Sequence, residues 1–503
     1  MPMKFTSHSP AETERLAARL SLWVRPGFLI RLAGDLGSGK STFARAFIRE
    51  MAANLGRGDF DIPSPTFTLV QSYSETRLPV FHADLYRLKS AADVEELGLG
   101  ELLSTHVGLV EWPELLPVGL SPDVLTLCFS GSGEVRGIDM VAEGAWVSAL
   151  QRDAQIEAFL GSAATRHFLE GDASARRYEW LEDEGGSNPL LMDMPTRPDG
   201  PPVRHGKPYS AIAHLAEGLP AVVAMNGVLG ERGYSAPKVL RHDLESGLAL
   251  IENLGSRVYG KMLVSGEDMT EPMLAAAGVL ADMARHNWPS HVSVADGISH
   301  QVRPYDADAL LIEADLLPSW FWPYLHGRNA APDVNASFEA VWRTIIPYTE
   351  QVRPQWVLRD YHSPNLLWIP ERKGLQRVGL IDTQDAVMGH AAYDLASLTQ
   401  DARVDIPGAL VQRTISHYLD LRKREPGFSA EDFMTAYAVL GAQRATKILG
   451  IFARLSKRDG KHGYLRHMPR VSWALAKNLE HPVLRELKQW YLDHLPEALK
   501  VKA

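Results

Sequence analysis

Short apolar runs and helical repeats alternate along the first 150 residues of the chain. The runs GFLIRLAG, VGLVEW and VLTLCF have the length and composition of buried strands. The stretches AETERLAARLSLWV and STFARAFIREMAANLG instead repeat their apolar residues at helical spacing. Strands that alternate with helices in this way predict an α/β domain whose sheet is covered by helices.

The pattern changes after a helical stretch at residues 146–160. ATRHFLEGDASARRYEWLE and NPLLMDMP alternate as a β-hairpin and a third strand, and the chain beyond LALIENLG is mostly helical. This order predicts an α+β bilobal domain, with a small lobe at about residues 160–256 and a large lobe at about 257–495. We place the boundary near residue 150, which gives domains of residues 1–150 and 151–503.

Length and charge change this picture little. A chain of 503 residues exceeds the size at which a single core usually keeps growing, so two domains are expected. A net charge of -9 argues against a broad surface for nucleic acid, so any role with RNA is expected to be indirect. No apolar run approaches the roughly 20 residues that span a bilayer, which predicts a cytoplasmic protein without membrane contact. Cys128, inside VLTLCF, is expected to be a buried small hydrophobic residue.

A phosphate-binding motif lies between the first predicted strand and the following helix. Gly34, Gly39, Lys40 and Ser41 satisfy G-x-x-x-x-G-K-[ST], whose backbone N–H groups surround phosphate oxygens. In such loops the lysine reaches the β and γ phosphates and the serine binds Mg²⁺. The alternative is a glycine-rich turn that contains Lys-Ser by chance. The nucleotide-binding residues predicted in this loop are Gly34, Asp35, Gly37, Ser38, Gly39, Lys40, Ser41 and Thr42.

Hydrolysis of ATP also needs a carboxylate for magnesium and a group that positions water. Asp84 ends the apolar strand LPVFHAD, Thr66 lies in SPTFTL, and Glu111 with Trp112 ends VGLVEW. Each residue also has a structural interpretation. Thr66 could belong to a turn, Glu111 to a solvated strand end and Trp112 to the core.

Taken in order, GDLGSGKST, SPTFTL, HADLYRL and VEWPE resemble the TsaE family of ATPases, over about residues 5–145. The resemblance implies ATP hydrolysis in support of a complex whose other subunits transfer threonylcarbamoyl to an adenosine of tRNA. It implies phosphate and metal contacts for Lys40 and Ser41, a metal and switch site at Thr66 and Asp84, and nucleotide neighbours Glu111 and Trp112. Asp35 is also characteristic of the family, and we expect its side chain to point away from the phosphates or to meet the metal.

A second ATP-related pattern is LRDYHSPNLLWI, in which Asp360 and Asn365 have D-x-x-x-x-N spacing, followed by Asp382 in GLIDTQD. In kinase-like folds the first Asp accepts the proton of the attacking hydroxyl, while the Asn and the later Asp bind magnesium. One loop must hold both base and metal ligand, which explains the fixed spacing. The alternative is a surface Asp with a capping Asn.

Two departures separate this motif from protein kinases, since Leu358 stands where they have His and Thr383-Gln384 replaces Phe-Gly. Together with GDASARRY, ALIENLG and GHAAYDLASL, the motifs resemble the aminoglycoside-phosphotransferase branch. Within that branch they resemble the bacterial kinases of N-acetylmuramate and N-acetylglucosamine, over about residues 160–490. The resemblance implies phosphorylation of the anomeric hydroxyl, with Asp360 as base and Asn365 and Asp382 as magnesium ligands.

The resemblance also assigns residues around the nucleotide. It implies a hinge at IENLG, where Glu252 and Leu254 meet adenine through the backbone, and a phosphate-covering turn from Gly171 to Arg177. The turn residues expected near the nucleotide are Ser174, Arg176 and Arg177. Asp193 stands where phosphotransferases usually place a phosphate-binding Lys. This difference leaves open the alternative of a pseudokinase, which binds nucleotide without transferring phosphate. Asp394 is expected to be a structural anchor.

The sequence therefore predicts a bifunctional protein that uses ATP and Mg²⁺ at two sites. One half would support tRNA modification together with the threonylcarbamoyltransferase subunits and meet tRNA only indirectly. The other half would phosphorylate an amino sugar. An alternative makes the second half a nucleotide- or sugar-binding module that regulates the ATPase. The sequence does not identify the sugar, the oligomeric state or any coupling between the halves.

Overall fold

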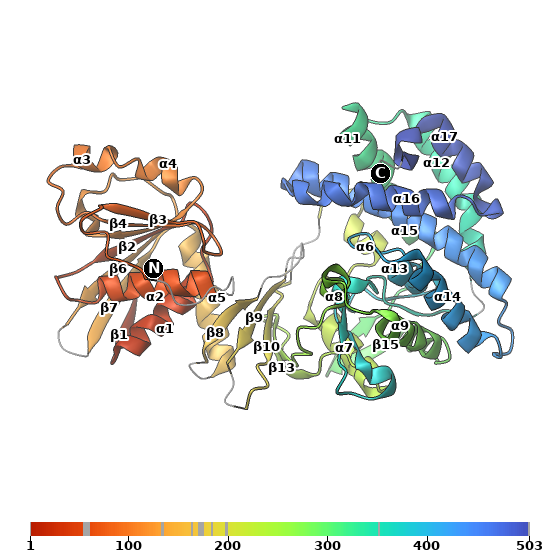
Figure 1. Ribbon diagram of the computed structural model, residues 1–503, viewed down its shortest axis with the longest axis horizontal. Helices are drawn as coiled ribbons and strands as arrows, with labels where there is room; N and C mark the ends of the chain where they lie inside the picture. Colours follow the sequence, from red (N-terminus) through yellow and green to blue (C-terminus); the bar gives the residue numbers. More distant parts are fainter. Residues whose placement is uncertain are drawn as a thin grey trace. The chain divides into compact units, whose positions relative to one another are not determined.

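The computed structural model of the protein describes residues 2–53, 61–131, 135–161, 164–169, 176–182, 185–196, 200–350 and 353–500. The chain divides into two compact units (Figure 1). The first contains residues 1–194 and 248–250, and the second contains residues 195–247 and 251–503. Among the described residues, no helix combines the length and apolar character needed to cross a membrane.

The first unit has two sheets and six helical segments. Its strands are β1 (Pro2–Ser7), β2 (Leu29–Ala33), β3 (Val70–Tyr73), β4 (Val80–Asp84), β5 (Val107–Glu111), β6 (Val124–Ser130), β7 (Arg136–Ala142), β8 (Arg166–Leu169), β9 (Arg177–Leu181), β10 (Leu190–Asp193) and most of β14 (Leu248–Ile251). Its helical segments are α1 (Pro10–Ser21), α2 (Lys40–Ala53), α3 (Ala91–Glu95), α4 (Leu99–Leu103), η1 (Pro113–Leu115) and α5 (Ala145–Leu160).

The larger sheet of this unit has seven strands in the order β1-β7-β6-β2-β5-β4-β3. Its four central strands, β6, β2, β5 and β4, are parallel, and the flanking strands are antiparallel. β2 lies in the middle, so the loop that follows it reaches the carboxyl edge of the parallel strands, where α/β sheets bind ligands. The α/β prediction for the N-terminal half is confirmed.

Alternate residues of β6 point to opposite faces of the sheet, which corrects one expectation. Leu127 and Phe129 are buried in the core, whereas Cys128 between them is exposed. The apolar composition of VLTLCF suggested burial on both faces. The outer face of this strand is not covered at Cys128.

Helix α5 contributes to two hydrophobic cores of the first unit. Trp146 and Leu150, near its start, pack in the core of the seven-stranded sheet. Ile156 and Leu160, near its end, pack with Leu181 and other residues of the second sheet. Within the first unit that sheet has the strand order β14-β10-β9-β8, with antiparallel pairing of β8, β9 and β10. The helix expected at the domain boundary is thus one continuous element.

A buried ionic network fixes α5 to the second sheet. Arg166 on β8 donates to Asp153 of α5 at 2.8 Å and to Glu179 of β9 at 2.7 Å. The side chains of all three residues are less than 5% exposed. Asp153 also accepts a hydrogen bond from the indole of Trp23 at 2.9 Å. Because each buried charge has a partner, the network is stable as a set and sensitive to the loss of one member.

The second unit is mostly helical and has short hairpins. Its strands are β11 (Pro202–Arg204), β12 (Lys207–Pro208), β13 (Val239–Asp243), β15 (His291–Ala295), β16 (Ile298–Gln301), β17 (Gln355–Val357), β18 (Leu366–Trp368), β19 (Val378–Leu380) and β20 (Val387–Gly389). Its α-helices are α6 (Tyr209–Ala213), α7 (Leu219–Glu231), α8 (Tyr259–Ser265), α9 (Thr270–Met283), α10 (Ala307–Ala314), α11 (Trp322–His326), α12 (Pro332–Ile345), α13 (Ala392–Thr399), α14 (Gly408–Arg422), α15 (Ala430–Asp459), α16 (Met468–Asn478) and α17 (Arg485–His494). Shorter turns are the π-helix η2 (Leu317–Phe321) and the 3-10 helices η3 (Ile346–Thr349), η4 (Ser363–Asn365), η5 (Gly374–Arg377), η6 (His462–His467), η7 (Pro482–Leu484) and η8 (Pro496–Leu499).

Helix α15 is the central element of the second unit. It packs against α10, α13, α16 and η2, and Figure 1 shows it beside α13 and α16. Gly450 permits the close approach to η2, because a Cβ there would lie 2.4 Å from the backbone carbonyl of Leu316. α15 begins at a serine cap, where Ser429 accepts a hydrogen bond from the N–H of Asp432, and Gly460 in a left-handed conformation ends it.

We expect Arg166→Ala to lower the free energy of unfolding of the first unit by about 3 kcal/mol, because it removes the buried cation shared by Asp153 and Glu179, which keep only Arg19 and Arg177 as cationic partners. Arg15, whose side chain is 53% exposed and 3.8 Å from Glu12, provides a matched control. Arg15→Ala should cost less than about 0.5 kcal/mol. Urea unfolding of the full chain measures both changes. Equal losses for the two variants would contradict a stabilising role for the network.

Candidate active sites

The first site is the loop between β2 and α2. Gly34, Gly37 and Gly39 all have positive φ angles, of 129°, 76° and 110°. A Cβ at Gly34 would lie 2.3 Å from the carbonyl oxygen of Phe129 on β6, so only glycine fits there. The loop leads directly into the first turn of α2, where Ser41 and Thr42 are half-buried.

Lys40 is held by the loop itself. Its Nζ donates to the carbonyl oxygens of Gly34 at 2.6 Å and Asp35 at 2.8 Å. The ammonium group also lies 4.0 Å from the centre of the Trp112 ring. Burial lowers the pKa of Lys40, while Glu111 and Asp84 oppose that change. The ammonium group of Lys40 is therefore held beside the loop by hydrogen bonds, within reach of any phosphate that the loop binds.

Arg136 of β7 supports the loop from outside. Its Nε donates to the carbonyl oxygen of Ser38 at 2.8 Å, and a terminal nitrogen donates to that of Gly37 at 3.3 Å. The loop carbonyls are thereby directed toward Arg136. No local motif marks this residue, because it lies almost 100 positions from its partners in sequence.

Four polar side chains gather beside the loop at the ends of β4 and β5. Asp84 and Glu111 are paired neighbours on these parallel strands. The hydroxyl of Ser41 donates to Glu111 at 2.9 Å, and that of Thr66 donates to Asp84 at 2.6 Å. His82 lies 2.9 Å from the other oxygen of Glu111 and was not found from the sequence. Serine, threonine and carboxylate oxygens are the ligands that Mg²⁺ prefers.

The second site is formed by two hairpins of the second unit. β17 pairs with β20 and β18 pairs with β19, with Leu366 opposite Leu380. Asn365 directly precedes one member of this pair, and Asp382 follows the other by two positions. The amide of Asn365 donates to the backbone carbonyl of Asp360 at 3.1 Å and to the carboxylate of Asp382 at 3.5 Å. Pairing of the hairpins thus brings all three residues together.

The backbone of this site is strained at two positions. Arg359 and Asp382 have φ angles of 66° and 62°, which non-glycine residues adopt only when the surroundings hold them there. The fully buried Asp394 of α13 accepts hydrogen bonds from the N–H groups of Leu358 at 2.7 Å and Arg359 at 2.9 Å. Asp394 therefore holds the loop and does not face a substrate.

Arg359 itself is part of a buried charge network below Asp360. Glu313, only 1% exposed, accepts hydrogen bonds from Arg359 and Tyr305, and Lys447 lies 3.3 Å away. Burial opposes the ionisation of Glu313, but Arg359 and Lys447 lower its pKa. Burial likewise opposes the ionisation of Asp360, and His362, Lys447 and Arg359 together lower its pKa. The carboxylate of Asp360 is thus kept ionised.

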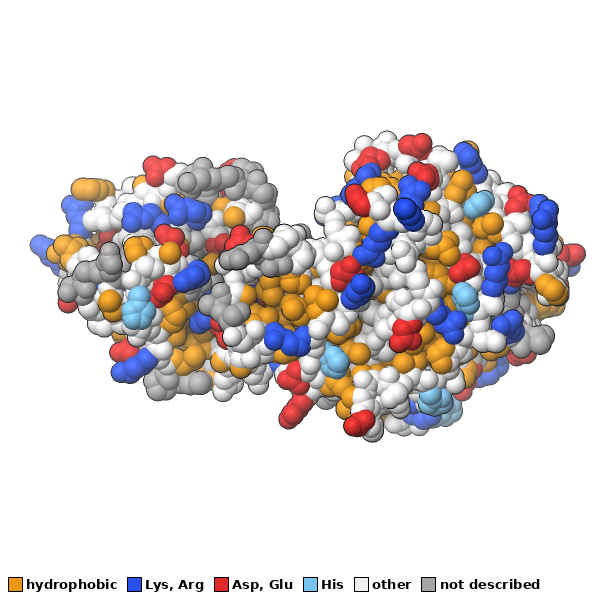
Figure 2. All heavy atoms as spheres, turned by 90° about the horizontal axis from the view of Figure 1, so that it is seen from below, with side chains coloured by type: hydrophobic (Ala, Val, Ile, Leu, Met, Phe, Trp, Pro, Cys, Tyr) orange, Lys and Arg blue, Asp and Glu red, His pale blue; other side chains and the backbone are white. Residues whose placement is uncertain are grey.

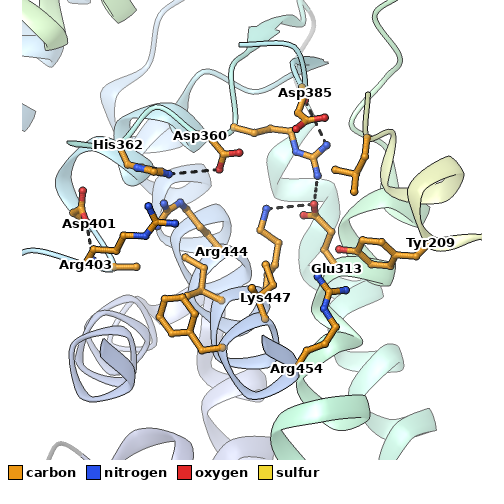
Figure 3. A pocket seen from close by; sticks show the side chains of 16 residues that line it. Tyr209, Glu313, Asp360, His362, Asp385, Asp401, Arg403, Arg444, Lys447 and Arg454 are labelled. Atoms are coloured by element: carbon orange, nitrogen blue, oxygen red, sulfur yellow. Dashed lines mark hydrogen bonds and ion pairs between the residues drawn. The ribbon is translucent and has the colours of Figure 1, made fainter. Parts of the chain in front are cut away.

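A cavity of about 190 Å³ opens beside Asp360 (Figure 3). Residues of α15 form one wall, and Tyr209 and the loop after α13 contribute to the others. The cavity is lined by Tyr209, Leu215, Glu313, Arg359, Asp360, His362, Asp385, Asp401, Ala402, Arg403, Arg444, Lys447, Ile448, Ile451, Phe452 and Arg454.

The residues predicted around the nucleotide of the second site have varied positions. Ser174 lies outside the described residues, and Arg176 directly precedes β9. The guanidinium of Arg177 lies 3.7 Å from the Trp23 ring and donates to Glu179 at 2.5 Å. Asp193 accepts from Arg152 of α5 at 2.6 Å. Arg177 and Asp193 therefore take part in contacts within the first unit.

The predicted hinge has a defined structure. The carboxylate of Glu252 accepts from Arg372 at 2.6 Å, and its backbone N–H donates to the carbonyl of Lys238. Leu254 packs with Leu367 and Ile369 in a small apolar cluster. The carboxylate and the backbone N–H of Glu252 are thus both engaged within the second unit, and Leu254 is buried in the apolar cluster.

Neither site is an all-protein metal cage. Among the described residues, no group of three or more His, Cys, Asp or Glu side chains could hold a metal ion. Mg²⁺ is commonly bound through one or two carboxylates together with the phosphates of a nucleotide. Asp84 with Ser41 and Thr66 fits that pattern, and so does Asp382 with Asn365.

Comparisons with known proteins divide the chain in the same way. The family described as "Threonylcarbamoyl adenosine biosynthesis protein TsaE" matches residues 7–137, and the "Phosphotransferase enzyme family" matches residues 165–430. An N-acetylmuramate/N-acetylglucosamine kinase of Caulobacter vibrioides is 37% identical over 69% of this chain and 97% of its own length. A kinase of the same name from Pseudomonas aeruginosa is 30% identical over 63% of this chain and 85% of its own length. The tRNA threonylcarbamoyladenosine biosynthesis protein TsaE of Rickettsia bellii is 38% identical over 22% of this chain and 73% of its own length.

Gly34→Ala should weaken nucleotide binding at the first site by at least about tenfold, because the new methyl group collides with the Phe129 carbonyl and distorts the loop. Gly37→Ala is the matched control, since a Cβ at Gly37 has no atom within 4 Å. Gly37→Ala should weaken the free energy of nucleotide binding by only about 1 kcal/mol, because alanine is strained at the positive φ angle of this position. Titration with a fluorescent ATP analogue measures the affinity of both variants for nucleotide. The chain also carries Asp382→Asn, so that binding at the second site does not obscure the first. Similar affinities for the two variants would contradict the steric argument.

Proposed function

The chain belongs to the TsaE family over its N-terminal part and to the phosphotransferase enzyme family over its C-terminal part, and we propose that it carries two separate ATP-dependent activities. The N-terminal half hydrolyses ATP in support of the threonylcarbamoyladenosine modification of tRNA. The C-terminal half transfers a phosphoryl group from ATP to the anomeric hydroxyl of N-acetylmuramate or N-acetylglucosamine. The names of the relatives supply the two processes and the two sugars, and the geometry supports the residue roles proposed below.

In the N-terminal half, the loop from Gly34 to Ser41 binds the triphosphate. Lys40 leaves the carbonyl groups that it contacts and moves to the β and γ phosphates. Ser41, Thr66 and Asp84 are the residues that would hold Mg²⁺, which would neutralise phosphate charge there. Glu111, whose carboxylate is already positioned by Ser41 and His82, orients the attacking water.

The partners of this half are protein subunits of a threonylcarbamoyltransferase complex, and contact with tRNA is indirect. The charge distribution supports this assignment. The net charge is -9, and on the face shown in Figure 2 the Lys and Arg side chains are interspersed with Asp and Glu. A nucleic-acid surface would gather basic side chains on one face.

In the C-terminal half, Asp360 is the general base. The observation that carries this proposal is the hydrogen bonding of Asn365 to both Asp360 and Asp382, beside a cavity that opens at the Asp360 carboxylate. Asn365 and Asp382 would hold Mg²⁺, and Asp360 accepts the proton of the sugar hydroxyl as the phosphoryl group is transferred. The lowered pKa of Asp360 keeps the base ionised at neutral pH.

Lys40→Ala should abolish the tRNA modification in cells whose only TsaE-type protein is this full chain, because the loop then lacks its phosphate-binding ammonium group. Mass spectrometry of digested tRNA measures the content of threonylcarbamoyladenosine. Lys89→Ala, at an exposed lysine of the same unit, is the control and should leave that content unchanged. Normal modification with Lys40→Ala would mean that the N-terminal half does not act through ATP.

Asp360→Asn should lower the rate of phosphoryl transfer to the sugar by about 10²- to 10⁴-fold, since the amide does not accept the proton. Transfer of labelled phosphate from ATP to N-acetylmuramate and to N-acetylglucosamine gives the rate, and calorimetry shows whether ATP still binds. Asp420→Asn, at a carboxylate that is 65% exposed, is the control. Absence of transfer by the unmodified chain, with both ligands bound, would instead favour a regulatory binding module.

A further inference from the structure

The cavity beside Asp360 has a basic wall formed by α15. Arg444, Lys447 and Arg454 line it from this helix, together with the apolar side chains of Ile448 and Ile451. Residues 444, 447, 448 and 451 recur at spacings of three and four, so they share one face of the helix. None of the aromatic residues between Leu317 and Arg328 lines this cavity.

Most acidic side chains of the cavity already have partners. Glu313 accepts hydrogen bonds from Arg359 and Gln443 and pairs with Lys447. Asp401 accepts from the hydroxyl and N–H of Ser363, at 2.6 and 2.9 Å. Asp360 is the proposed base. Glu313 and Asp401 are therefore paired with groups other than Arg444, and Asp360 acts on the charge of Arg444 without forming an ion pair with it.

Arg444 is a buried cation of this wall that forms no ion pair with a described residue, although the charges of Asp360 and Asp394 act on it from a longer distance. It is 5% exposed, and its guanidinium makes one described hydrogen bond, to the carbonyl oxygen of Gln400 at 3.3 Å. Among the residues that the structure describes, no carboxylate lies within ion-pair distance of it. A guanidinium has five N–H donors, and burying its charge without an anion is costly. A buried arginine of this kind at the wall of a cavity indicates a site for an anionic group of a ligand.

Arg403, from the loop that follows α13, adds to the positive potential at the same end of the cavity. Figure 3 shows the side chains of Arg403 and Arg444 on the same side of the cavity as His362. Burial lowers the pKa of His362, and Arg444 and Arg403 both lower it further, against the opposite effects of Asp360 and Asp401. Both arginines therefore act on one ring, which itself lies 3.8 Å from the base Asp360.

We propose that Arg444, assisted by Arg403, binds a carboxylate on the acceptor, so that the kinase half selects an acidic amino sugar over a neutral one. The inference rests on the proposed function and identifies its substrate class. N-acetylmuramate carries a carboxylate on its lactyl ether, whereas N-acetylglucosamine has a hydroxyl at that position. Arginine suits this role because its planar fork matches the two oxygens of a carboxylate.

The rest of the cavity fits the same acceptor. Ile448, Ile451 and Phe452 offer an apolar surface for the C–H groups of a sugar ring, between the charged groups of α15. The acceptor hydroxyl meets Asp360 and the carboxylate meets Arg444, so two fixed polar contacts define the orientation of the ring. Arg444 lies beyond residues 165–430, which the phosphotransferase model matches, as expected for a residue that selects one acceptor rather than serving the shared chemistry.

Calorimetry on the full chain tests the proposal without relying on turnover. We expect N-acetylmuramate to bind about 10- to 100-fold more tightly than N-acetylglucosamine, the range given by hydrogen bonds to a charged group. The methyl ester of N-acetylmuramate keeps the bulk and removes the charge, and should bind no better than N-acetylglucosamine. Equal affinity for the acid and its ester would overturn the proposal, and this comparison needs no variant that must fold.

The variant Arg444→Gln should remove the preference for the acid and leave the affinity for N-acetylglucosamine within about twofold, which is below the value of one charged hydrogen bond. Arg458→Gln, on the exposed end of the same helix, is the matched control and should keep the preference. Equal losses for both sugars with Arg444→Gln would overturn the proposal and place Arg444 at the transferring phosphoryl group. An intact preference without any phosphoryl transfer would support the carboxylate site and contradict the proposed function.

Discussion

A nucleoside triphosphate carries several negative charges, and a protein binds it where the site offers compensating positive charge. This chain is built to meet that requirement twice, by different means. In the first unit, a glycine loop presents main-chain N–H groups, and Lys40 donates hydrogen bonds to the carbonyl oxygens of Gly34 and Asp35. In the second unit, Asn365 and Asp382 form a place for a cation beside Asp360. In each unit, the pairing of neighbouring strands brings these residues together.

Both sites depend on buried polar groups that are paired away from the ligand. Arg136 holds the carbonyls of the first loop, and Asp394 holds the N–H groups of the second. Glu313 pairs with both Arg359 and Lys447 below Asp360, and the positive charge that remains favours the ionised form of the base. Arg444 differs because it forms no ion pair with a described residue. Paired residues such as Glu313 maintain the structure of the site, whereas Arg444 is proposed to bind the ligand.

The sequence predicted both folds, since each rests on local features: apolar runs, helical repeats and motifs confined to one loop. It also proposed Lys40, Asp84 and Asp360 as site residues, because the residue types at strand ends restrict the chemistry. It did not reveal Arg136, His82 or Glu313, whose respective partners Ser38, Glu111 and Arg359 lie at least 29 positions away and share no motif with them. Cys128 was wrongly expected to be buried, because composition alone does not say which face of a strand is covered. Nor does composition tell a paired arginine from the unpaired Arg444.

The central claim is that one polypeptide holds two independent nucleotide sites. The most direct test is the stoichiometry with which the full chain binds a non-hydrolysable ATP analogue in the presence of magnesium, measured by equilibrium dialysis at saturation. The account predicts two nucleotides per chain. A single nucleotide per chain at saturation would contradict it.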